Sequence, residues 1–112
     1  MEVKINVEKE FERQLRKLIK KYRSIIDDYD TFLNELEKDP YQGNSLGRGV
    51  RKVRMAIASK GKGKRGGARV ITYNLYQEED VIVIDLLTIY DKNEISNISD
   101  FITYLLNERE NI

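Results

Sequence analysis

The spacing of the apolar residues changes along this chain, and these changes limit the folds it can adopt. Between Phe11 and Leu36, large apolar side chains recur every three or four positions, which is the period of a helix with one buried face. Before this stretch, and from Val50 to Tyr90, they alternate with polar residues or form short continuous runs, which is typical of strands. The pattern therefore predicts two helices with strands before and after them, an α+β fold.

Caps, breakers and turns set the expected bounds of the elements. A strand is expected over Met1–Val7, followed by two helices; Ser24 and Asp27 resemble a capping box for the second, and Pro40 ends it. The later elements are expected to be strands at Val50–Ala58, Ala68–Tyr76 and Val81–Tyr90, a flexible loop at Ser59–Gly67, a turn at Gln77–Asp80 and a short C-terminal helix from Ser99. We expect a single domain over residues 1–112, with two N-terminal helices packed on a small, mainly antiparallel sheet.

The charged residues are strongly segregated, although the formal net charge is only +1. The segment from Pro40 to Gln77 holds nine Lys and Arg, all seven glycines and no Asp or Glu. The rest of the chain carries 11 basic and 19 acidic residues. Nine cations without a counter-charge repel one another, so this segment favours a polyanionic partner such as RNA. A shorter basic run could equally be an ordinary solvated face.

The residue types that the chain lacks exclude several kinds of site. It has no Cys and no His, which rules out disulfide scaffolds, cysteine nucleophiles and sites that depend on imidazole. No Walker phosphate loop is present, and the run Arg65–Val70 lacks the aromatic residues of an RNA-recognition motif. The chain shows no signal-peptide pattern and no apolar run that could span a bilayer, so we expect a cytoplasmic protein without a membrane partner.

Three segments resemble the RelE/ParE superfamily of bacterial toxins. They are Gly49–Arg54, Lys60–Tyr73 with the string K-G-K-G-K-R-G-G-A-R-V, and Leu87–Lys92 with the string L-T-I-Y-D-K. The chain is most similar to the RelE/HigB-like branch of type II toxin–antitoxin systems. The resemblance implies a RelE-like fold and a ribosome-dependent endoribonuclease (an mRNA interferase) that inhibits translation. It also implies a cognate antitoxin that silences the toxin in a hetero-oligomer.

The resemblance also implies which residues form the catalytic site. Lys52, Arg54 and Arg69 match family positions associated with catalysis. Tyr90 and Lys92 lie at a strand end where the family often has an aromatic and a basic residue. For attack by the RNA 2′-OH, Lys52 would act as base or charge stabiliser, and Arg54 and Arg69 would clamp the phosphate. Tyr90 could stack on a base, assist proton transfer or be an ordinary sheet-edge residue, and Lys92 could protonate the leaving group.

A second group of basic residues is expected to hold RNA backbone rather than to take part in chemistry. These residues are Arg51, Lys60, Lys62, Lys64 and Arg65. No metal or other cofactor is expected, because the basic segment contains no carboxylate that could hold Mg²⁺. Asp85, Asp91 and Glu94 are interpreted as ordinary polar residues near strand ends.

Other functions remain open at this point. ParE-like relatives poison DNA gyrase and are not nucleases, and a non-catalytic RNA-binding module would carry the same basic charge. An inactive relic that acts in autoregulation with its antitoxin is a further alternative. The combination of the five catalytic candidates with the basic loop favours the nuclease, because gyrase-directed relatives generally lack such a set.

Overall fold

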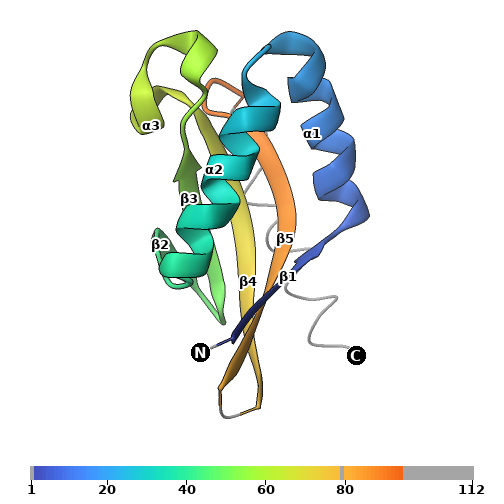
Figure 1. Cartoon of the computed structure of the whole chain (residues 1–112), viewed down its shortest axis with the longest axis vertical. Coiled ribbons are helices and arrows are strands. Elements are labelled where there is room, and N and C mark those ends of the chain that lie inside the picture. Colours follow the sequence, from blue (N-terminus) through green and yellow to red (C-terminus); the bar gives the residue numbers. More distant parts are fainter. Residues whose placement is uncertain (1, 79, 95–112) are drawn as a thin grey trace.

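The computed structural model describes residues 2–78 and 80–94 and shows an α+β fold (Figure 1). Its sheet has the strand order β1-β5-β4-β3-β2, with β1 parallel to β5 and every other pair antiparallel. The strands are β1 (Glu2–Val7), β2 (Asn44–Gly47), β3 (Val50–Met55), β4 (Ala68–Glu78) and β5 (Val81–Asp91), and the N-terminal helices are α1 (Lys9–Lys21) and α2 (Ile25–Lys38). The prediction of two N-terminal helices on a mainly antiparallel sheet is confirmed.

The main core lies between these two helices and one face of the sheet (Figure 1). The helical spacing puts Phe11 and Leu18 of α1, and Phe32 and Leu36 of α2, on the buried side, where each is at most 4% exposed. The sheet contributes Val53, Met55, Val70, Ile82, Ile84, Leu86 and Ile89. Full burial of one such side chain contributes about 1.5–3 kcal/mol, so this layer holds the helices on the sheet.

The start of α2 differs from the predicted capping box. The Ser24 hydroxyl donates to the Asp28 carboxylate (2.6 Å) and accepts the N–H of Ser59 (2.9 Å), and it does not cap the helix. Asp28 also accepts the backbone N–H of Ala58 (3.1 Å). These side chains therefore tie the start of α2 to the turn that follows β3.

An edge strand, β2, forms where the sequence predicted none. All four of its residues are exposed, so no apolar alternation marks it in the sequence. Asn44 pairs with Lys52 and Ser45 with Arg51 of β3. Because its strand character comes from this pairing and not from burial, the pattern of side chains could not reveal it.

The basic, glycine-rich segment between β3 and β4 is folded, whereas the sequence predicted a flexible loop. It contains a 3₁₀ turn at Ala58–Lys60 and a single helical turn, α3, at Gly63–Gly66, and β3 ends at Met55. A Cβ atom on Gly67 would lie 2.1 Å from the carbonyl oxygen of Met55. Only glycine allows this close approach, which packs the segment against β3.

A bulge in β5 decides which side chains lie on the face away from the helices. Between residues 71 and 72 of β4 the partner in β5 moves by two residues, which leaves Leu87 as an extra residue. Leu86 before the bulge belongs to the core under the helices, whereas Tyr90 packs in a small cluster on the opposite face. Strict alternation would have put Leu86 and Tyr90 on the same side.

The turn of the β4–β5 hairpin is shorter than the predicted Gln77–Asp80, because β4 continues to Glu78, which pairs with Val81. The predicted C-terminal helix from Ser99 lies outside the described residues. None of the helices within residues 2–78 and 80–94 is long and apolar enough to cross a membrane.

Candidate functional site

Three of the predicted catalytic residues lie in one row across neighbouring strands. Arg54 of β3 is the register partner of Arg69 in β4, and Arg69 is the partner of Tyr90 in β5. Lys52 lies two residues before Arg54, on the same face of β3, and pairs with Ile71 in the next row. Because neighbouring strands are about 4.8 Å apart, the four side chains form one group on the face away from the helices. We call them the cationic row.

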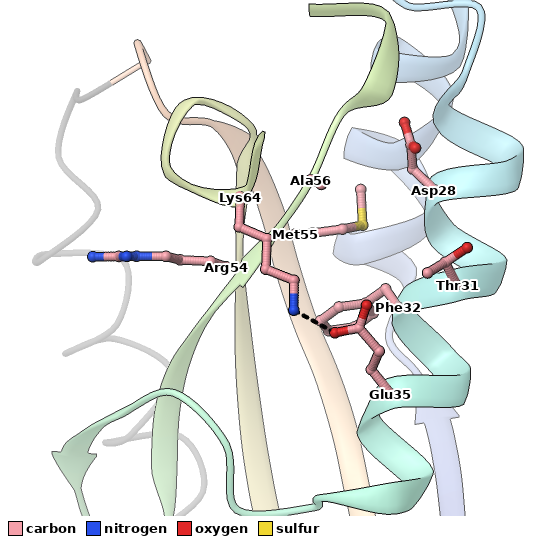
Figure 2. A pocket seen from close by; sticks show the side chains of 8 residues that line it. All are labelled: Asp28, Thr31, Phe32, Glu35, Arg54, Met55, Ala56 and Lys64. Atoms are coloured by element: carbon pink, nitrogen blue, oxygen red, sulfur yellow. Dashed lines mark hydrogen bonds and ion pairs between the residues drawn. The ribbon is translucent and has the colours of Figure 1, made fainter. Parts of the chain in front are cut away.

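Lys52 and Arg54 are the cations of this group whose side chains have no polar partner among the described residues. Arg54 is exposed and Lys52 is half-buried, and neither side chain forms an ion pair or hydrogen bond with the residues that the structure describes. Figure 2 shows Arg54 extending away from α2. Two unpaired cations on one face favour an anionic ligand, because a bound phosphate would offset their mutual repulsion.

Arg69 is held in place by backbone carbonyl groups. Its guanidinium donates to the carbonyl oxygens of Lys64 (3.2 Å), Arg65 (3.0 Å) and Ala68 (3.1 Å). Burial lowers the pKa of Arg69, and the charge of Arg54 lowers it further. An arginine still keeps its charge at neutral pH. Arg69 is therefore a fixed cation in the site, and it also fastens α3 to β4.

Tyr90 places a phenol at the end of the row. Its ring is half-buried and packs with Val50, Ile71 and Leu87. Burial raises the pKa of Tyr90, an effect that the charge of Arg69 partly offsets. The phenol therefore keeps its proton at neutral pH and is a neutral hydrogen-bond donor at the end of the row.

Lys92, the fifth predicted catalytic residue, lies outside the row. β5 ends at Asp91, and Lys92 begins the turn that follows. Its backbone N–H donates to the carbonyl oxygen of Gly67 (3.0 Å), and the residue is exposed. Lys92 is thus at the border of the site, two positions beyond Tyr90.

The five basic residues expected to hold RNA are used in three different ways. Arg51 donates to two backbone carbonyl groups in the segment between α2 and β2 (3.1 and 2.8 Å). Lys60 and Lys64 form ion pairs within the protein. Lys62 and Arg65 are exposed, and their side chains form no hydrogen bond or ion pair with the described residues. Lys62 and Arg65 are therefore the members of this group whose charge remains available to a partner outside the described residues.

Asp91 is a buried residue whose role the sequence did not reveal. It is 1% exposed, and its carboxylate accepts hydrogen bonds from the Tyr22 hydroxyl, from Lys60 (2.9 Å) and from the N–H of Asn93 (3.2 Å). Burial alone would raise the pKa of Asp91, but the hydrogen bonds from Tyr22 and Lys60 lower it far below its ordinary value. The Lys60–Asp91 pair therefore pins the turn after β3 to the end of β5, next to Tyr90. The sequence showed only an acidic residue at the end of an apolar strand.

A second ion pair joins the basic segment to α2. Lys64 of α3 reaches Glu35, and the pair lies in the wall of a small pocket of about 60 Å³ between α2 and β3 (Figure 2). A wider hollow of about 350 Å³ also has Lys64 and Arg54 in its wall, together with Lys52. The sequence did not indicate the ion pair of Glu35, because this residue lies on the polar side of an ordinary amphipathic helix.

The chemistry of this site follows from its own side chains. A search against known protein families found no match to this chain. Among residues 2–78 and 80–94, no three acidic residues are grouped so that they could hold a metal ion. The cationic row offers fixed charges for a phosphate, an amine, and a neutral phenol that can donate a proton.

Proposed function

We propose that this protein is a toxin of the RelE/HigB-like branch of the RelE/ParE superfamily, an endoribonuclease that cuts mRNA on the ribosome. The observation that carries the proposal is the cationic row: Arg54, Arg69 and Tyr90 in register, with Lys52 beside Arg54. Two neighbouring guanidinium groups suit the non-bridging oxygens of a phosphodiester. An amine and a phenol in the same group supply candidates for both proton transfers.

In the proposed reaction, the ribose 2′-OH attacks the adjacent phosphorus. This step forms a 2′,3′-cyclic phosphate and breaks the bond to the 5′-oxygen of the next nucleotide. Lys52 accepts the proton of the 2′-OH or stabilises the developing charge, and Arg54 and Arg69 bind the phosphorane oxygens. Tyr90 protonates the leaving 5′-oxygen, a role supported by its place in register with Arg69, and Lys92 is the alternative donor. The fixed cations stabilise the charge that a metal stabilises in other nucleases, so the proposed reaction needs no metal or cofactor.

The proposed partners are the ribosome with its mRNA and a cognate antitoxin, in the cytoplasm. Lys62 and Arg65 would contact RNA backbone, since their side chains are exposed. The nine cations between Pro40 and Gln77 would attract an antitoxin with acidic residues. Binding there would cover the phosphate site and silence the toxin in a hetero-oligomer.

The test is cleavage of a defined mRNA on purified ribosomes, with 5′ ends mapped by primer extension. Wild-type protein should cut the mRNA, and Arg54→Gln should lower the rate by about 100-fold or more, because it removes charge stabilisation from the transition state. Arg23→Gln is the matched control, since Arg23 is exposed and outside the site. Absence of cleavage, together with inhibition of gyrase supercoiling, would replace this proposal with a ParE-like function.

A further inference from the structure

A hollow of about 350 Å³ lies beside β3 and shares Lys52 and Arg54 with the cationic row. It exists because β2 is short: Asn44–Lys52 is the last pair between the two strands, and β3 continues for three residues beyond it. The edge of β3 is therefore left uncovered by β2 at this point. The volume is at the lower end of the range of about 300–1,000 Å³ that small-molecule sites occupy.

The backbone that borders the hollow is fixed by close contacts. Gly43 has a φ of +91°, and a Cβ atom there would lie 2.4 Å from the carbonyl oxygen of Lys52. Only glycine lets the segment between α2 and β2 pass so close to β3. Arg51 also donates to the carbonyl oxygen of Gly43 (2.8 Å). This wall of the hollow is therefore preformed, and no ligand is needed to order it.

The charge in the wall of the hollow is entirely positive. Its charged lining residues are Lys52, Arg54 and Lys64, and no carboxylate lines it. Lys64 is paired with Glu35 outside the hollow, whereas Lys52 and Arg54 have no partner among the described residues. The hollow thus favours an anionic ligand, and a phosphate is the anion that the neighbouring row is suited to hold.

Two side-chain amides lie in the same wall. Gln42 donates one N–H to the carbonyl oxygen of Asp39 (3.2 Å), which leaves its amide oxygen to accept a further hydrogen bond. Asn44 is exposed, and its amide forms no hydrogen bond with the part of the chain that the structure describes. An amide offers a donor and an acceptor side by side, the arrangement that pairs with the edge of a base, adenine above all.

We propose that this hollow is a nucleotide subsite, in which Asn44 contacts the edge of a base while Lys52 and Arg54 hold its phosphate. This inference rests on the proposed function, since the nucleotide would be the one that flanks the phosphate cleaved in the cationic row. Asn44 is then a specificity-determining residue, and adenine is the base it selects.

The test is a titration of the full-length, ¹⁵N-labelled protein with AMP, GMP, CMP, UMP and inorganic phosphate, followed by NMR. The expected result is tightest binding of AMP, with shifts at residues 42–44 and 52–54. Asn44→Ala should weaken AMP binding roughly tenfold, the loss expected for one bidentate base contact, and leave phosphate binding unchanged. Asn34→Ala is the matched control, because Asn34 is an exposed asparagine of α2 outside the hollow.

Two results would overturn the subsite: equal affinity for all four nucleotides, or a base preference that Asn44→Ala leaves intact. The titration needs no ribosome, so its outcome is separate from that of the cleavage assay. Protein that prefers AMP through Asn44 but cuts no mRNA would overturn the proposed function alone. Protein that cuts mRNA without this preference would overturn the subsite alone.

Discussion

The ion pair between Lys60 and Asp91 decides whether Lys60 is a structural residue or an RNA contact, and Lys60→Ala tests this directly. The Lys60 side chain is 10% exposed, with its Nζ 2.9 Å from Asp91 and 5.6 Å from the centre of the Tyr22 ring. The substitution removes this ammonium group and leaves the carboxylate of Asp91 buried. We therefore expect a large loss of stability.

The size of the loss follows from the donors that remain. Removing one partner of a buried ion pair costs about 3–5 kcal/mol, because the other charge stays buried. Asp91 would keep the hydrogen bonds from Tyr22 and Asn93, and Lys21 lies 3.5 Å away on the solvent side. The expected change in the free energy of unfolding is therefore at the lower end, about 3 kcal/mol. With a urea m-value of about 1.5 kcal/mol per M, the midpoint falls by about 2 M.

The assay is urea unfolding at pH 7, followed by far-UV circular dichroism. Lys62→Ala is the matched control, since this exposed lysine two residues away should change stability by less than about 0.5 kcal/mol. The double variant Lys60→Ala/Asp91→Asn should lose less stability than the sum of the single changes. Equal midpoints for Lys60→Ala and Lys62→Ala would refute the structural role and return Lys60 to the RNA-binding group.

Three further predictions concern pH, Arg69 and the nucleophile. Because the pKa of Asp91 is lower in the folded protein than its unfolded value of about 3.9, its stabilising effect is present above that value and is lost as pH falls below about 4. Wild type should therefore lose more stability between pH 6 and pH 3 than Asp91→Asn, and parallel urea midpoints would contradict this. Arg69→Ala should abolish cleavage and also destabilise the fold by about 1–2 kcal/mol, since three carbonyl groups lose their donor; an unchanged melting temperature would count against that structural role. An mRNA with a single 2′-deoxy nucleotide just 5′ of the cut should resist cleavage on the ribosome, and undiminished cutting would exclude attack by the 2′-OH.

The sequence by itself determined the type and order of most elements. Apolar spacing is a local property, so it located α1, α2 and the strands of the hairpin before any contact was known. It also put Lys52 and Arg54 on one face, because residues two apart in a strand always share a face. The separation of charge along the chain pointed to an anion-binding surface in the same way.

Only the tertiary structure decided how these pieces form a site. Arg54 and Arg69 meet through strand register, and Tyr90 joins them because the bulge at Leu87 reverses the alternation of β5. Lys60 belongs to the same basic run as Lys62, yet it turns inward to a carboxylate 31 residues away. Register, bulges and buried ion pairs depend on which distant segments lie side by side. A pattern of neighbouring residues does not contain that information, and the packing of the fold supplies it.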